Sequence, residues 1–155
     1  MTMQDMIKVY HAHSASHKYI IGFIRDSKVY YATVTFDKLN AMLKACKASN
    51  KRGGFNKVRV YVSASQQKAM ISNGEAVEIC MMEDLVAEKY NKGELFEKVI
   101  TEKLTGEKWE KDSLPFYEGG DIVLNGENIQ IKLNGAELTN EKCLENMLKK
   151  MGKAV

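Results

Sequence analysis

The sequence predicts an α/β (α+β) protein with a β-rich α+β first part and a second part made of a helix, a β-hairpin and a helix. Short apolar segments rich in β-branched residues flank the dipeptides Asp26-Ser27 and Asn125-Gly126, as they do in β-hairpins. Apolar residues recur at helical spacing in residues 94–106 and 143–151. The chain has 155 residues, of which 45% are hydrophobic, so it can bury a core without a metal or a disulfide.

The first part, residues 1–90, is predicted to alternate strands with short helices. A strand around residues 6–12 precedes the hairpin of residues 18–25 and 28–35. Asp37 is the expected N-cap of the next helix. Four apolar residues at helical spacing extend that helix to a breaker at residues 49–54: Leu39, Met42, Leu43 and Cys46. The elements expected after it are a strand at 57–63, a helix at 64–74 and a strand at 76–81.

The second part, residues 91–155, begins near a change of composition at residues 82–93. A helix in residues 83–90 is expected to break at Asn91-Lys92-Gly93, and the helix of residues 94–106 to end at Gly106. Glu97 lies at the edge of the apolar stripe of that second helix, where a carboxylate usually has a partner or a ligand. Asn140 can cap a last amphipathic helix.

The hairpin around Asn125-Gly126 carries polar residues on one face. A type I′ turn at this dipeptide pairs Ile122 with Ile129, and Asp121 with Gln130. Because side chains alternate between faces, one face is apolar, with Ile122, Leu124, Ile129 and Ile131. The other face carries Asp121, Gln130 and Lys132, with Val123 and Asn128 nearer the turn. Aspartate is disfavoured in strands, so this cluster indicates a functional site more than a solvated surface.

The charge of the chain is unevenly distributed. Residues 36–59 contain seven basic residues and one acidic residue, a net charge of +6, whereas residues 60–155 carry a net charge of −5. Such a segment is typical of a surface that binds nucleic acid, although a lysine-rich solvated helix would have the same charge. The candidate contacts to nucleic acid are Lys44, Lys47, Lys51 and Arg52.

The cysteines and histidines give weaker signals. Cys46, Cys80 and Cys143 are odd in number and widely spaced, which favours free thiols in a reducing cytoplasm. The first residues lack the pattern of a signal peptide, and no apolar run is long enough to span a bilayer, so we expect no membrane association. His11, His13 and His17 have no carboxylate or cysteine beside them, and we interpret them as ordinary strand or surface histidines and not as a metal cluster.

Residues 94–151 resemble the PD-(D/E)XK nuclease superfamily. The resemblance is carried by a helix with "LFEKVI", a strand start "GGDIVL" and a following strand "IQIK". It is strongest to the restriction-endonuclease-like, Mrr-like branch, in which glutamine replaces the second acid of the motif. By this resemblance Glu97, Asp121, Gln130 and Lys132 are the catalytic residues, and the second half has a restriction-endonuclease-like core. Gly120 stands where many members have proline.

The resemblance implies a metal-dependent nuclease, and the residues suit that chemistry. Phosphodiester hydrolysis requires a hard cation, Mg²⁺ or Mn²⁺, held by oxygen ligands. Asp121 and Glu97 offer carboxylates, and Gln130 and Ile131 offer carbonyl oxygens. Lys132 can orient the attacking water or stabilise developing negative charge. The expected ligand is nucleic acid, with DNA favoured over RNA, in a cytoplasmic protein that can be a homodimer and is typical of phages or mobile elements.

Two alternatives stay open. The neutral amide of Gln130 is compatible with a protein of nuclease fold that binds nucleic acid or another protein without cleaving. A domain with no role in nucleic-acid binding would require both the basic segment and the polar hairpin face to be coincidental.

Overall fold

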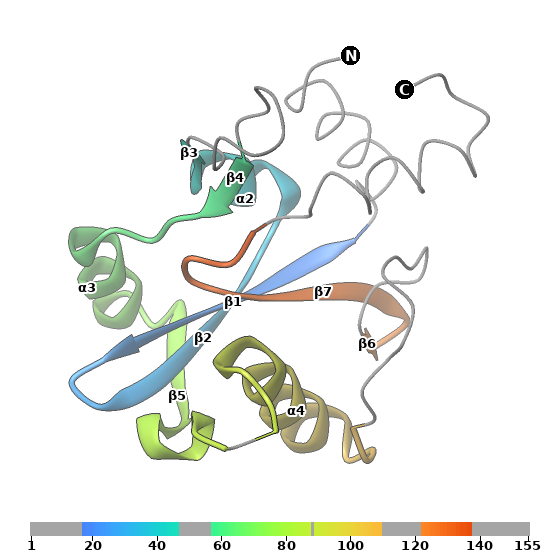
Figure 1. The fold of residues 1–155 in the computed structure, drawn as a ribbon. Coiled ribbons are helices and arrows are strands. Elements are labelled where there is room, and N and C mark those ends of the chain that lie inside the picture. The colour runs from blue at the N-terminus through green and yellow to red at the C-terminus, as the bar shows by residue number, and fades with distance from the viewer. Residues whose placement is uncertain (1–16, 47–56, 88, 110–121, 138–155) are drawn as a thin grey trace.

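The computed structural model describes residues 17–46, 57–87, 89–109 and 122–137. These residues form an α+β fold in which a curled mixed sheet has helices on both faces, and a second, two-stranded sheet packs on one of these faces (Figure 1). The elements in chain order are β1 (Lys18–Arg25), β2 (Lys28–Val34), α2 (Phe36–Ala41), β3 (Leu43–Cys46), β4 (Lys57–Val60), α3 (Ala64–Ser72), β5 (Ala76–Met81), the 3₁₀ helix η2 (Met82–Leu85), α4 (Lys92–Thr105), β6 (Ile122–Leu124) and β7 (Glu127–Leu133).

The large sheet joins strands from both parts of the chain. Its strand order is β5-β2-β1-β7-β6. Strand β1 pairs antiparallel with β2 and parallel with β7, so the parallel contact links the two parts. The predicted domain regions 1–90 and 91–155 therefore share one sheet over their described residues.

Both predicted hairpins have the expected turns. Asp26 and Ser27 have φ angles of 52° and 62°, and Asn125 and Gly126 have φ angles of 51° and 77°. Two successive residues with positive φ define the type I′ turn that matches the twist of a hairpin. The pairing of Ile122 with Ile129 and of Leu124 with Glu127 confirms the predicted register of the second hairpin.

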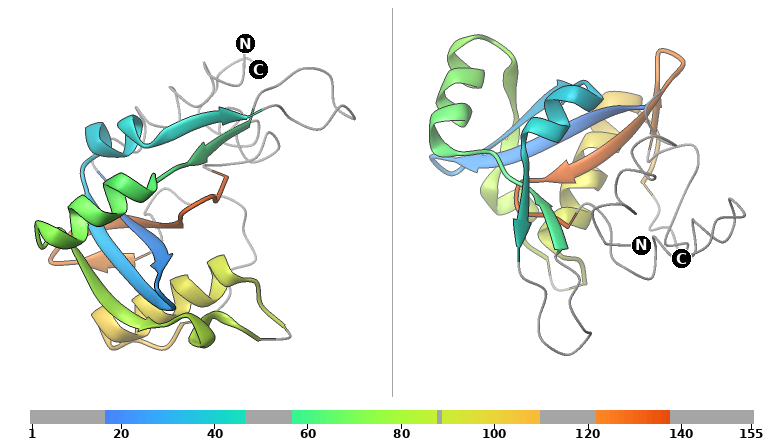
Figure 2. Two further views of the ribbon diagram at one scale, coloured as in Figure 1. Left: turned by 90° about the vertical axis from the view of Figure 1, so that its left-hand side faces the viewer. Right: turned by 90° about the horizontal axis from the view of Figure 1, so that it is seen from above.

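Two hydrophobic clusters cover the two faces of the sheet. Helix α4 packs on one face, where Phe96 and Ile100 meet Ile20 and Ile131. The other face is covered by α2, α3 and the β3–β4 pair, whose apolar side chains surround Tyr19. Figures 1 and 2 show α4 on one side of the sheet and β3 and β4 on the other. Side chains that point to opposite faces of β1 and β7 therefore pack against different elements of the fold.

Glycine at position 22 lets α4 approach the centre of β1. The side chain of Phe96 is fully buried. A Cβ added at Gly22 would lie 2.2 Å from Cζ and 2.5 Å from Cε1 of Phe96. Only hydrogen fits between the strand and this ring, because a carbon cannot approach another nonbonded carbon so closely.

Several predicted elements are confirmed. The strand at 76–81 is β5, and the helix predicted at 64–74 is α3, which has a capping box between Ser63 and Gln66. Helix α4 ends at Gly106, whose φ of 74° gives the left-handed C-cap.

The helix predicted from Asp37 to Cys46 is wrong. Its N-cap is Thr35, whose side chain accepts a hydrogen bond from Lys38 N, and Asp37 lies in the first turn. The helix ends at Ala41, and Leu43–Cys46 form a strand paired with Lys57–Val60. Backbone pairing with a distant strand overrides the helical spacing of these few apolar residues. The strand predicted at 57–63 is correspondingly shorter, because Ser63 caps α3.

The helix predicted at residues 83–90 is also wrong, because this segment contains only the 3₁₀ turn η2. Asp84 accepts a hydrogen bond from Met81 N at 2.9 Å, and Leu85 is buried. The chain leaves the turn at Val86 in an extended conformation. The predicted strand at 6–12 and the predicted helix after Asn140 lie outside the described residues.

Asn134 connects the end of β7 to the chain after β4. Its Oδ1 accepts a hydrogen bond from Val62 N at 2.9 Å, and its Nδ2 donates to Val62 O at 3.4 Å. The side-chain amide therefore pairs with Val62 as a neighbouring strand would. Val62 is buried, so its N–H depends on this amide.

Replacing Asn134 with alanine is expected to destabilise the fold. The change removes the acceptor of a buried N–H, which costs about 1–3 kcal/mol of the free energy of unfolding. Urea denaturation followed by circular dichroism measures the change. Asn128→Ala, on the same strand but partly exposed, should cost clearly less, and equal losses in the two variants would contradict this role of Asn134.

Candidate functional site

The polar face of β7 points away from α4. Gln130 pairs with Tyr19 and Lys132 pairs with Ile21, and both β1 residues belong to the cluster on the side of α2 and α3. Ile131, between them, points to the α4 side. The structure therefore brings Gln130 and Lys132 to one face, as the alternation of the hairpin predicts.

Gln130 is more deeply buried than a residue on a solvated face. Its exposed fraction is 7%, and the neighbouring Tyr19 is fully buried. Burial raises the pKa of the Tyr19 hydroxyl to about 12. The phenol beside Gln130 is therefore neutral near pH 7, and it adds a polar group to this face but no charge.

Glu137 contacts both Lys132 of β7 and Arg59 of the β3–β4 pair. Lys132 Nζ donates to the backbone oxygen of Glu137 at 3.4 Å. The carboxylate of Glu137 lies 3.5 Å from Arg59 Nη2 of β4. Arg59 Nη1 also donates to Gly135 O at 2.8 Å, and the backbones of Arg59 and Glu137 form an isolated bridge. The predicted catalytic lysine and the basic segment are therefore neighbours in the fold.

The outer face of the β3–β4 pair carries cationic and aromatic side chains. Lys44 and Arg59 are cross-strand partners, and partners in an antiparallel pair share a face. Lys44 Nζ lies over the ring of Tyr61, 5.0 Å from its centroid, and Tyr61 is 49% exposed. Val58 and Val60 point the opposite way, into the core. We call Lys44, Arg59 and Tyr61 the ribbon face.

Tyr61 was not predicted as a functional residue, and Arg59 was counted in the basic segment of residues 36–59 but not among the candidate contacts to nucleic acid. The signal was present in the alternation of "KVRVYV", in which Arg59 and Tyr61 fall on one face of a strand. It was overlooked because the basic segment was considered by its net charge and not by the faces of the strand predicted at 57–63.

Of the other predicted site residues, one lies on the opposite side of the sheet and four lie outside the described residues. Glu97 belongs to α4, which packs on the face of the sheet opposite to Gln130 and Lys132. Asp121, Lys47, Lys51 and Arg52 lie outside the described residues. Within the described ranges, no three histidine, cysteine, aspartate or glutamate side chains are grouped so that they could hold a metal. Among the described cysteines, Cys80 is buried and free.

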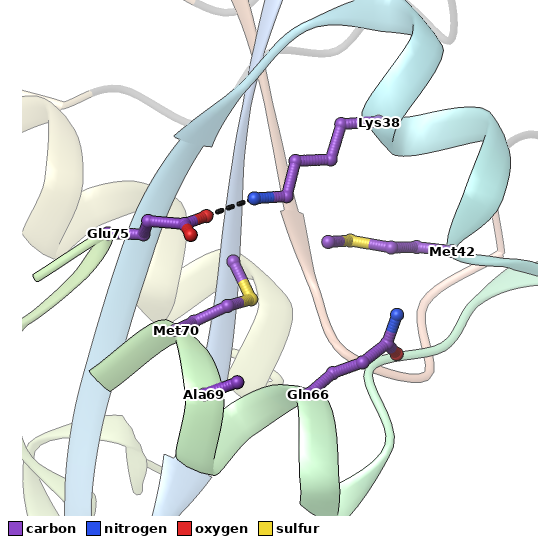
Figure 3. Close-up of a pocket in the computed structure, with 6 residues that line it drawn as sticks. All are labelled: Lys38, Met42, Gln66, Ala69, Met70 and Glu75. Carbon is purple, nitrogen blue, oxygen red and sulfur yellow. Dashed lines mark hydrogen bonds and ion pairs between the residues drawn. The ribbon is translucent and has the colours of Figure 1, made fainter. Parts of the chain in front are cut away.

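Two pockets lie away from these residues. One, of about 180 Å³, lies between α2 and α3 and is lined by Met42 and Met70, with the ion pair of Lys38 and Glu75 at its edge (Figure 3). A hydrogen bond and the positive charge of Lys38 lower the pKa of Glu75. The other, of about 270 Å³, contains Cys80 and lies beside α4. Burial raises the pKa of the Cys80 thiol, with Asp84 adding to the effect, so this thiol is a poor nucleophile near pH 7.

No protein-family model matches the chain, and neither a curated protein nor a solved structure matches it. None of the described helices is long and apolar enough to cross a membrane.

Proposed function

We propose that the protein is a metal-dependent nuclease whose β6–β7 hairpin carries the reactive groups and whose β3–β4 pair holds the nucleic acid, with DNA favoured over RNA. One observation carries the proposal. Glu137 contacts both Lys132 of β7 and Arg59 of β4. Lys132, which the sequence assigned to catalysis, and Arg59, which belongs to the basic segment, are therefore linked through one residue, although 73 positions separate them.

The proposed metal ligands are oxygen atoms of Asp121, the residue that precedes β6 in the sequence, and of two residues in the middle of β7. Asp121 would supply the charge, and the Gln130 side chain and the Ile131 backbone would supply neutral carbonyl oxygens, a donor set that suits Mg²⁺ or Mn²⁺. The bound ion would polarise the phosphate and lower the pKa of an attacking water. Lys132, on the face of Gln130, is suited to orient that water or to stabilise negative charge that develops on the phosphate.

The position of Glu97 changes the expected ligand set. It lies on α4, across the sheet from Gln130. The resemblance to the restriction-endonuclease-like fold implies that this carboxylate joins the metal site. Because α4 packs on the opposite face from Gln130, we propose for Glu97 only a secondary role. The first ligands in the proposal are Asp121, Gln130 and the Ile131 carbonyl.

A second function is favoured by the burial of Gln130. A neutral amide with only 7% of its surface exposed is a weaker metal ligand than an accessible carboxylate. A protein that binds nucleic acid with the same two elements, and does not cleave it, would keep Arg59 and Lys44 and would need no metal.

Incubation with labelled DNA and RNA, single-stranded and duplex, separates the two functions. We expect cleavage with Mg²⁺ or Mn²⁺ and none with EDTA. Asp121→Ala should abolish cleavage and leave the circular dichroism spectrum unchanged, whereas Asp37→Ala, in the first turn of α2, should cleave as the wild type does. Binding without cleavage under all of these conditions would favour the second function.

A further inference from the structure

The ribbon face brings two cationic side chains and a tyrosine together on one surface. Lys44 and Arg59 lie directly opposite each other across the pair. Like charges at such positions destabilise a sheet. Glu137 and the Gly135 carbonyl contact Arg59. The strand pair therefore holds two cationic groups on one exposed face, an arrangement that suits an anionic ligand.

Tyr61 adds a flat aromatic surface beside these cations. About half of its side chain is exposed, although a tyrosine can bury much more apolar area in a core. Its backbone continues the pairing of β4, because Tyr61 N donates to Met42 O. The ring is thus carried by a paired stretch of backbone, and the Lys44 ammonium lies over it.

Cations beside an exposed aromatic ring are the combination that binds single-stranded nucleic acid. Phosphates contact the cations, and an unpaired base stacks on the ring. A duplex offers the same phosphates but keeps its bases paired and stacked, so the ring would contribute little to binding it. The position of Arg59 next to Glu137, which also contacts Lys132, directs a bound strand toward the hairpin.

We propose that the ribbon face binds single-stranded nucleic acid, with a base stacked on Tyr61 and phosphates held by Lys44 and Arg59. This inference rests on the proposed function and names its substrate class: an unpaired strand or an unpaired end of a duplex. Phosphates and a base that can stack are common to DNA and RNA, so both are included in the test.

Fluorescence anisotropy with labelled oligo-dT, oligo-U and a duplex of equal length, in EDTA, tests the inference without any cleavage. Tyr61→Ala is expected to raise the Kd for both single strands by about 5- to 100-fold and the Kd for the duplex by less than about twofold. Tyr61→Phe keeps the aromatic plane and should bind as the wild type does. Lys44→Ala should weaken the binding of the single strands and of the duplex. It should also reduce the steepness of the slope of log K against log salt for single strands by about 0.7.

Lys68→Ala, at an exposed position of α3, is the matched control and should change neither affinity nor salt slope. A thermal melt of each variant shows that the fold is retained. Three outcomes would overturn the inference: a Tyr61→Ala protein that is folded and binds single strands as the wild type does, an equal loss for single strand and duplex, or a loss in Tyr61→Phe as large as in Tyr61→Ala.

The same proteins assayed with Mg²⁺ or Mn²⁺ separate this inference from the proposed function. If the Tyr61→Ala protein still cleaves and binds single strands with unchanged affinity, the proposed role of the ribbon face is wrong and the proposed nuclease function is retained. If Tyr61→Ala selectively loses single-strand binding but neither this variant nor the wild type cleaves, the role of the ribbon face is supported and the nuclease function is contradicted.

Discussion

Replacing Gly22 with alanine is expected to lower the free energy of unfolding by about 3 kcal/mol, the upper part of the usual range for overpacking a core. The added Cβ would lie within 2.7 Å of three ring atoms of Phe96. That ring is fully buried between α4 and the sheet, so it cannot turn away without displacing the helix. In a domain of this size, the loss corresponds to a fall in Tm of about 6–12 °C. Urea denaturation and a thermal melt measure both quantities.

Gly93→Ala is the matched control for this substitution. Gly93 lies in the first turn of α4, where the nearest atom to an added Cβ is Asn91 Oδ1 at 3.4 Å. Alanine there should be neutral or stabilise the helix by up to about 1 kcal/mol. The double variant Gly22→Ala, Phe96→Leu should recover part of the loss, because the smaller side chain makes room for the methyl group. A Gly22→Ala protein as stable as the wild type would contradict the close contact of β1 and α4.

Replacing Lys132 with methionine is expected to reduce the rate of phosphodiester cleavage by about 100- to 1,000-fold, as the loss of one charge-stabilising group usually does. The substitution keeps the unbranched stem on the face of Gln130 and removes the charge. Metal affinity should be unchanged, because a lysine is not a ligand. Stability should fall by less than about 1 kcal/mol, since the hydrogen bond from Nζ to Glu137 O is long, at 3.4 Å. Single-turnover cleavage at saturating Mn²⁺ measures the effect.

Lys103→Met is the matched control for Lys132→Met. Lys103 Nζ also donates to a backbone oxygen, that of Ile79, at 2.6 Å. It belongs to α4, on the other face of the sheet. The rate should therefore stay near that of the wild type. Similar losses in the two lysine variants would show that charge in general, and not the group at position 132, supports cleavage.

Gln130→Glu probes the same site from the metal side. It supplies the carboxylate that is general in the superfamily that the hairpin resembles, so Mg²⁺ should bind more tightly and cleavage should increase. The buried position opposes the charge, so a gain requires the metal. If neither the wild type nor the Gln130→Glu variant cleaves nucleic acid, nucleic-acid binding without cleavage is the favoured function.

The sequence by itself determined the parts of this protein whose signals are local. Both hairpins follow from two-residue turns, because Asp26-Ser27 and Asn125-Gly126 can adopt the positive φ angles that a type I′ turn requires. A fixed turn fixes the register, and the register decides that Gln130 and Lys132 share a face. Helix α4 was equally predictable, because its length gives a clear apolar stripe and Gly106 ends it. The resemblance to a nuclease motif depends on the same local spacing and stays a prediction.

The tertiary structure decided where those parts meet. Residues 43–46 carry apolar side chains at spacings that also suit a helix, and only pairing with Lys57–Val60 makes them a strand. The parallel contact of β1 with β7 joins residues more than a hundred positions apart, and no local pattern specifies such a partner. The same contact places Gln130 beside Tyr19 and puts α4, with Glu97, on the opposite face. The meeting of Lys132 and Arg59 at Glu137 is likewise a product of the fold, because only packing of the sheet against the β3–β4 pair brings these charges together.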